Sequence, residues 1–261
     1  HAYDYVGFRI GFWSAYENFL WAPNQVIPST LLAGMLTYLI INRGDLLKMV
    51  FPISLSFWWA VFPVFFLAVY LIVLVLIQII KKPSLLLTYV QRFDVIVPLL
   101  TCLPVLILYL SKQTYPVGLW AWELGDYTEN FIKEYGLNII GNLLLMGFIN
   151  WFIRQRTAFT LPSLPLMVLI ALTIIFSLYI GGEHNDSFFR GVMPYLIIMG
   201  IYIVYPISGM NHSDFWGMLK QNRFAWFVIL FMLGSTFLLG IVRFSRALIN
   251  NKITANIGMS D

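Results

Sequence analysis

Residues 161–207 read LPSLPLMVLIALTIIFSLYI-GGEHNDSFFR-GVMPYLIIMGIYIVYPI, which is two apolar runs joined by a short polar segment. The runs Leu161–Ile180 and Gly191–Ile207 have the length and composition of segments that cross a bilayer. The joining segment carries strongly polar side chains at Glu183, His184, Asn185, Asp186 and Arg190. Because such groups are costly at a membrane boundary unless they pair or bind a ligand, we interpret this segment as a candidate site.

The composition of the whole chain also indicates a membrane protein. Of its 261 residues, 60% are apolar and 11% are charged, and the mean hydropathy is +0.80. Soluble domains are closer to half apolar and one quarter charged. We therefore predict an all-α fold: a polytopic transmembrane helical bundle that forms a single domain over residues 1–261. The bilayer is the expected partner, and the scattering of basic residues through short loops argues against nucleic acid.

About seven spans can be recognised. Six of them are Val26–Ile41, Pro63–Ile80, Val95–Leu110, Leu137–Ile153, Leu161–Ile180 and Phe224–Val242, and Gly191–Ile207 is a shorter seventh. Val50–Val61 is too short to cross alone. We expect it to be a re-entrant half-helix that leads into Pro63–Ile80, or the first part of one kinked helix.

Two single residues bear on the nature of the chain. The lone cysteine, Cys102, lies within an apolar run, which excludes an internal disulfide or a CxxC site and predicts a small buried side chain. The chain begins at His1 and shows no signal peptide. We expect it to be the C-terminal part of a longer protein.

The positions of Lys and Arg predict the orientation in the membrane. Nine basic residues fall in loops that can share the cytoplasmic side: Arg43, Lys48, Lys81, Lys82, Arg92, Arg154, Arg156, Lys220 and Arg223. Only Arg9, Lys112, Lys133 and Arg190 fall on the other side before the tail is counted. This arrangement requires residues 50–80 to enter and leave on one side. The basic tail residues Arg243, Arg246 and Lys252 disagree with it, so the side of the tail stays open.

The same arrangement places three polar segments together on the non-cytoplasmic face. They are the opening stretch around Glu17 and Trp21, residues 112–136, and the segment Glu183–Arg190. We predict that residues 112–136 form an extracytoplasmic loop or an interfacial helix, because acids and aromatics alternate there. Polar groups that converge from distant positions can line a substrate cavity between helices, although exposed loops would look similar.

The polar segment after residue 180 can supply several kinds of chemistry. Glu183 and Asp186 are candidate catalytic residues, since a carboxylate can act as a general base or hold a divalent cation such as Mg²⁺ or Mn²⁺. In a helix Asp186 and Arg190 share a face and can pair. Alternatively, Asp186 or Asn185 caps the following helix. The same helix start, with Arg190, could instead bind phosphate. His184, Asn185 and Arg190 are therefore candidate substrate contacts.

The second candidate segment is Trp21-Ala22-Pro23-Asn24-Gln25-Val26-Ile27-Pro28. The amides of Asn24 and Gln25 can hydrogen-bond sugar hydroxyls or phosphate oxygens, and Trp21 can stack on a sugar ring. The simpler interpretation is a helix that starts at a proline beside an interfacial tryptophan.

A polar stripe runs through one of the predicted spans. Asn138, Asn142 and Asn150 recur at helical spacing within it. Such a stripe indicates hydrogen bonds between helices more often than ligand contacts.

These two candidate segments resemble paired motifs of the GT-C class of lipid-dependent glycosyltransferases. In that class a tryptophan-proline-amide motif precedes one helix, and Asn-Asp followed by Arg and Pro opens another, as in Asn185-Asp186 with Arg190 and Pro194. The resemblance implies a multi-pass enzyme of the bacterial inner (plasma) membrane. Its active site would lie on the non-cytoplasmic face and transfer a sugar from a polyprenyl-phosphate carrier to an acceptor with inversion.

The chain departs from the pattern of the class at one point. The class places its catalytic acid in the first extracytoplasmic loop, between its first two helices, and that N-terminal part is absent from this sequence. Glu17 or Asp186 would have to replace the acid unless it lies upstream. Two other functions therefore stay open: a transporter or flippase component, and a non-catalytic subunit that needs a protein partner.

Overall fold

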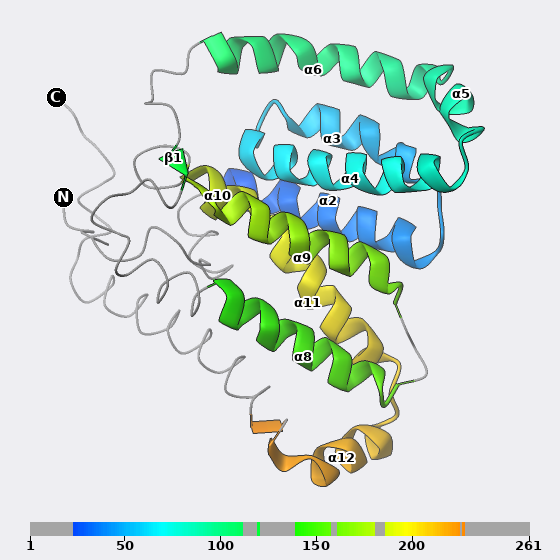
Figure 1. Cartoon of the computed structure of the whole chain (residues 1–261), viewed down its shortest axis with the longest axis vertical. Helices are drawn as coiled ribbons and strands as arrows, with labels where there is room; N and C mark the ends of the chain where they lie inside the picture. Colours follow the sequence, from blue (N-terminus) through cyan, green and yellow to red (C-terminus); the bar gives the residue numbers. More distant parts are fainter. Residues whose placement is uncertain are drawn as a thin grey trace, which may run out of the picture.

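The computed structural model describes residues 23–111, 119–120, 139–157, 161–180, 186–224 and 226–227 (Figure 1). The first half of this part consists of the helices α2 (Pro23–Ile41), η1 (Leu46–Met49), α3 (Val50–Ser56), α4 (Val61–Lys81), α5 (Leu85–Val90) and α6 (Phe93–Ser111). The second half contains α8 (Asn142–Arg154), α9 (Ser163–Ser177), α10 (Asp186–Gly191), α11 (Met193–Ser208) and α12 (His212–Gln221). The strands β1 (Leu119–Trp120) and β2 (Tyr179–Ile180) pair antiparallel.

The helices are long and apolar enough for a span at only some of the positions predicted. Within the described residues, Asn24–Ile41 and Val61–Lys81 meet the length and composition needed to cross a membrane. A third span results if α11 and α12, which meet at 110°, are taken together. With 21 residues, α4 is roughly 31 Å long, close to the thickness of a hydrocarbon core of about 30 Å. The fold is therefore a helical one whose longest helices indicate membrane association.

The connection before α4 has the topology expected for residues 50–80. The short helices η1 and α3 leave the end of α2, and the chain turns at Phe57–Ala60 into α4. The α3–α4 hairpin enters and leaves at the same end of the bundle (Figure 1). Trp58 and Trp59 are 56% and 61% exposed at its turn, as suits tryptophans at an interface.

Buried hydrogen bonds between side chain and backbone tie the central helices together. The hydroxyl of Tyr70 in α4 donates to the carbonyl of Pro165, and that of Tyr202 in α11 donates to the carbonyl of Pro162, both at 3.0 Å. Asn150 in α8 donates from Nδ2 to the carbonyl of Tyr202 at 2.9 Å, which confirms the predicted interhelical role for this asparagine. The only cysteine of the chain, Cys102, is buried as expected.

The structure shortens or divides two of the predicted spans. The helix in Leu161–Ile180 ends at Ser177, because Tyr179 and Ile180 pair with β1 instead of extending α9. The run Gly191–Ile207 is interrupted at Val192, between α10 and α11. The predicted span Phe224–Val242 lies almost wholly outside the described residues.

The bundle has two unlike ends. The ends of α2, α4, α8 and α11 lie away from β1 and α10 (Figure 1). The last turns of these helices and the segments that follow them carry the basic residues that were assigned to one side: Arg43, Lys48, Lys81, Lys82, Arg92, Arg154, Arg156, Lys220 and Arg223. We call this the basic end. The other end, where α2 and α11 begin and α10 and β1 lie, is called the polar end.

Candidate functional site

The polar end brings together segments that are far apart in the sequence. The start of α2, which carries Asn24 and Gln25, lies at the same end as α10, which carries Arg190 (Figure 1). α2 and α11 pack side by side from this end, and α10 packs on α4. The structure therefore gathers both candidate segments, where they are described, around the start of one helix pair.

Gln25 occupies the outermost position of the buried face of α2. Ser29, Leu32, Leu36 and Ile40 form a buried stripe at helical spacing along α2, and Gln25 lies one turn before Ser29 on the same face. The Oε1 atom of Gln25 is buried and, among the described residues, has no hydrogen-bond donor. A buried acceptor without a donor costs about 1–3 kcal/mol, so this atom is a natural position for a ligand donor.

Pro28 removes one backbone donor from the first turns of α2. Pro28 lies inside α2 and has no backbone N–H, so it cannot donate to the carbonyl of Asn24 four residues earlier. The side chains of Ser29 and Thr30 turn back to the carbonyls of Gln25 and Val26, the latter at 2.9 Å. Both hydroxyls thus bond within α2. Asn24 itself is exposed. The acceptor that the start of α2 offers at the polar end is therefore the Oε1 atom of Gln25.

A cluster of aromatic side chains holds α10 in place beneath this surface. The cluster consists of Phe66, Tyr70, Phe176, Phe188 and Tyr195. Phe66 stacks on Phe176 with ring centroids 4.1 Å apart, and the hydroxyl of Tyr195 donates to the carbonyl of Phe66 at 2.6 Å. Four of the five side chains come from α4, α10 and α11, so the cluster fixes α10 relative to the two helices that flank it.

Glycine at position 191 makes the close approach of α10 possible. A Cβ atom there would lie 2.5 Å from Cε2 of Phe66, well inside van der Waals contact. Phe188, one turn earlier, is fully buried. The backbone of α10 therefore lies directly on the Phe66 ring, and the position of Arg190 depends on this contact.

The structure supports part of the predicted geometry of the segment Glu183–Arg190. Asp186–Gly191 is helical, which meets the condition under which Asp186 and Arg190 share a face. Arg190 is half-buried. The side chain of Asp186 and the residues Trp21, Glu183, His184 and Asn185 lie outside the part of the chain that the structure describes.

Only two residues of the predicted loop 112–136 are described. Leu119 pairs with Ile180, and Trp120 pairs with Tyr179, whose ring lies edge-on at 5.5 Å. β2 in turn packs against α10. This part of the loop is thereby joined to the polar end, next to the candidate site.

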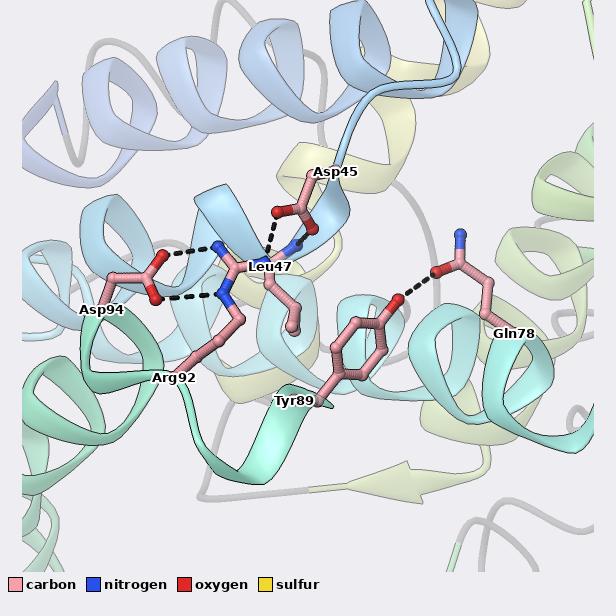
Figure 2. A network of polar contacts seen from close by, with 6 residues as sticks. All are labelled: Asp45, Leu47, Gln78, Tyr89, Arg92 and Asp94. Carbon is pink, nitrogen blue, oxygen red and sulfur yellow. Dashed lines mark hydrogen bonds and ion pairs between the residues drawn. The ribbon is translucent and has the colours of Figure 1, made fainter. Parts of the chain in front are cut away.

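The charges of the basic end form a separate network that sequence reasoning missed (Figure 2). Arg92 forms ion pairs with both Asp45 and Asp94, and its Nε donates to Oδ1 of Asp94 at 3.0 Å. Asp45 also accepts from the backbone N–H of Leu47 at 3.0 Å and so caps η1. The available signal was the presence of two acids among the basic loops, one of them two residues from Arg92.

This Arg92 network affects protonation at the bundle surface. The hydrogen bonds from Arg92 lower the pKa of Asp94 below its usual range, because they favour the ionised carboxylate. The bonds to Asp94 and then to Asp45 raise the pKa of Arg92. The network ties the connection after α2 to the start of α6, and its charges satisfy one another. We therefore interpret the Arg92 network as structural and call it the clamp.

The two ends thus differ in chemistry. The polar end offers the amide acceptor of Gln25, suited to a hydroxyl donor, and carries the half-buried Arg190, a residue type suited to anionic oxygens. Among the residues that the structure describes, no three His, Cys, Asp or Glu side chains gather as a metal site. A divalent cation would need the carboxylates of Glu183 and Asp186, whose side chains are not described.

Comparison of the chain with family models, curated proteins and solved structures finds no match.

Proposed function

We propose that this chain is the membrane-embedded part of a GT-C-like glycosyltransferase. It would transfer a sugar from a polyprenyl-phosphate carrier to an acceptor on the non-cytoplasmic face. The observation that carries this proposal is the buried Oε1 of Gln25, which has no donor among the described residues and lies at the polar end. A sugar hydroxyl is a donor of the right kind.

The roles of the candidate residues follow from their chemistry. Asn24 and Gln25 would bind sugar hydroxyls, with Trp21 stacked on the ring. Arg190, with or without a divalent cation, would stabilise the negative charge on the departing phosphate, while Asp186 or Glu183 removes the proton of the acceptor hydroxyl. His184 and Asn185 would complete the contacts to the carrier.

The orientation of this site follows from charge. The basic residues of the loops gather at the end opposite to Gln25 and α10 (Figure 1), and basic loops favour the cytoplasmic side. The polar end would then face away from the cytoplasm, where a carrier-linked sugar is presented in the class that the sequence resembles.

Two substitutions test the catalytic assignment. We expect Asp186→Ala and Arg190→Ala to abolish glycan transfer in membranes of producing cells, with thermal unfolding unchanged within a few degrees. Asp214→Ala and Arg223→Ala are matched controls, because these residues are exposed at the basic end. Transfer at the wild-type rate in either test variant would contradict the assignment.

The α3–α4 hairpin favours one other function. A helix pair that enters and leaves at one end is common in transporters, where broken helices line the substrate path. A flippase component with this hairpin would move carrier lipid between leaflets without forming a glycosidic bond. Lipid flux in liposomes without acceptor modification would favour that function over transfer.

A further inference from the structure

The short helix α5 lies at the basic end, outside the core of the bundle (Figure 1). It packs on α4 and α6, and none of its residues is buried. The 21 residues of α4 suffice to cross a hydrocarbon core of about 30 Å, and this helix ends at Lys81. Only residues 82–84 separate it from α5. We therefore expect α5 at the level where the bilayer meets water.

One face of α5 rests on the bundle. Leu85 and Tyr89 lie one turn apart on this face, and both are half-buried. The hydroxyl of Tyr89 donates to Oε1 of Gln78 in α4 at 3.4 Å (Figure 2). These contacts fix how α5 is rotated about its own axis, and so they determine which of its side chains face outward.

Two further faces of α5 are exposed, and they differ in chemistry. The first is apolar and consists of Leu86, Leu87 and Val90, which are 50%, 71% and 62% exposed. The second is polar and consists of Ser84, Thr88 and Gln91, which are exposed as well. At about 100° per residue, the bundle face and these two faces lie roughly 120° apart. A helix that divides its surface among a protein, an apolar and a polar side suits a position in the plane of a membrane interface.

Two lysines precede α5 at this level. The backbone N–H of Lys82 donates to the carbonyl of Gln78 at 2.9 Å, and its own carbonyl accepts from the N–H of Leu85 at 3.1 Å, so Lys82 is fixed between α4 and α5. Lys81 and Lys82 are exposed, and neither forms an ion pair with any residue that the structure describes. Arg92, at the other end of α5, is instead held in the clamp. The two lysines are therefore the cations that α5 can offer to an anionic partner.

We propose that α5 is an interfacial helix that binds anionic phospholipids of the leaflet at the basic end. Its apolar face lies among the acyl chains, its polar face stays in water, and Lys81 and Lys82 bind the headgroup phosphates. Anionic lipid fits this surface because two cations stand next to an apolar face at the membrane boundary. The surface lies at the basic end and does not depend on glycosyl transfer at the polar end.

The position of α5 is tested with the whole chain in vesicles of palmitoyl-oleoyl phosphatidylglycerol and the matching phosphatidylcholine. In a Cys102→Ser background, a nitroxide is attached to Leu87→Cys or, as the matched control, to Thr88→Cys, since both positions are exposed on α5. We expect the label at position 87 to collide with oxygen dissolved in the acyl chains, and the label at position 88 to collide with a water-soluble nickel complex. Equal collision of both labels with the nickel complex would overturn the proposal. So would protection of position 87 from both reagents, as under a second copy of the chain.

The headgroup contact is tested with a bimane label on Leu87→Cys. In vesicles of fixed composition, either the phosphatidylglycerol or the phosphatidylcholine carries brominated acyl chains, which quench the label on contact. We expect brominated phosphatidylglycerol to quench it roughly threefold more strongly or better. Lys81→Gln combined with Lys82→Gln should abolish this preference. Lys220→Gln combined with Arg223→Gln is the matched control, because it removes the same charge at exposed positions away from α5 (Figure 1), and it should keep the preference.

Two outcomes of the quenching experiment would overturn the proposal. One is equal quenching by the two brominated lipids in the labelled chain that keeps both lysines. The other is a preference for phosphatidylglycerol that survives the two lysine substitutions. The first outcome is measured without the lysine variant, so the proposal can be contradicted even if that variant fails to fold.

Discussion

The two ends of this bundle differ in the hydrogen bonds that their described polar groups make. At the basic end, Arg92 is bonded to Asp45 and Asp94, and Gln78 accepts from the hydroxyl of Tyr89 at 3.4 Å (Figure 2). At the polar end, the buried Oε1 of Gln25 has no donor among the described residues. Both ends are polar, but among the described residues a buried side-chain acceptor without a donor is found only at the polar end.

This difference distinguishes polar groups that stabilise the fold from a polar group that a ligand could bind. Groups that bond to one another fix the connections between helices, as Arg92 does between the chain after α2 and the start of α6. A buried acceptor that is left without a donor costs free energy, and such a cost is expected where a ligand supplies the missing partner. The comparison therefore favours the polar end for the proposed ligand site, and the clamp lies at the basic end.

The largest effect is expected where α10 lies on the aromatic cluster. Gly191→Ala would place a Cβ 2.5 Å from the ring of Phe66, and overpacking of this kind costs about 1–3 kcal/mol. We expect a lower midpoint of thermal unfolding and a loss of transfer, because Arg190 moves with α10. Gly200→Ala, where the Cβ meets nothing within 4 Å, should not be destabilising. Equal stability of the two variants would show that α10 does not depend on this contact.

The same substitution at the two ends should have opposite results. Gln25→Leu removes an acceptor that has no donor among the described residues, so we expect transfer to fall roughly tenfold while stability is kept or raised. Gln78→Leu removes an acceptor that Tyr89 uses, so stability should fall and transfer should be kept. Transfer assays in membranes and thermal unfolding measure the two quantities. If Gln25→Leu lowers stability and leaves transfer intact, Gln25 is a structural residue.

The hydrogen bond of Tyr195 tests how the aromatic cluster is anchored. Tyr195→Phe removes the bond to the carbonyl of Phe66 and keeps the ring. We expect a loss of about 1 kcal/mol in the free energy of unfolding. Tyr205→Phe on the exposed side of the same helix should cost less in denaturant unfolding, and an equal cost would contradict a specific role for the Tyr195 hydroxyl.

The smallest effect is expected at the clamp, because its groups are partly exposed and surface ion pairs contribute little. The pKa of Asp94 is lowered in the folded chain, so its contribution is present above the unfolded value of about 3.9 and is lost as the pH falls from there. Arg92→Gln should remove this loss of stability at acidic pH. The measurement is the midpoint of thermal unfolding at a series of pH values. An unchanged pH profile would contradict the clamp.

The sequence was sufficient for the helical class and for much of the arrangement. The apolar run in Pro63–Ile80 predicted α4, since a span of this length and composition has no other stable form in a bilayer. The basic loops predicted which helix ends lie together. Asn150 was correctly assigned to an interhelical hydrogen bond because polar groups within apolar runs need partners.

The remaining features of the fold and of the candidate site depend on contacts between residues far apart in the sequence, which a local sequence pattern does not predict. β2 ends α9 early because residues 179–180 find partners some 60 positions away, at Leu119 and Trp120. Gly191 is special only because Phe66 lies against it. Gln25 was a candidate from its side chain alone, but the lack of a donor for it in the part of the chain that the structure describes depends on how α2 packs.

The most direct test asks whether the two ends face opposite sides of the membrane. Cys102→Ser removes the only cysteine of the sequence. In this background, single cysteines are introduced at Asn24 and at Lys82, which are both exposed. Intact producing cells are treated with a membrane-impermeant maleimide. We predict that Asn24→Cys is labelled in intact cells and that Lys82→Cys is labelled only after permeabilisation. Labelling of Lys82→Cys in intact cells, with Asn24→Cys protected, would contradict a polar site on the non-cytoplasmic face.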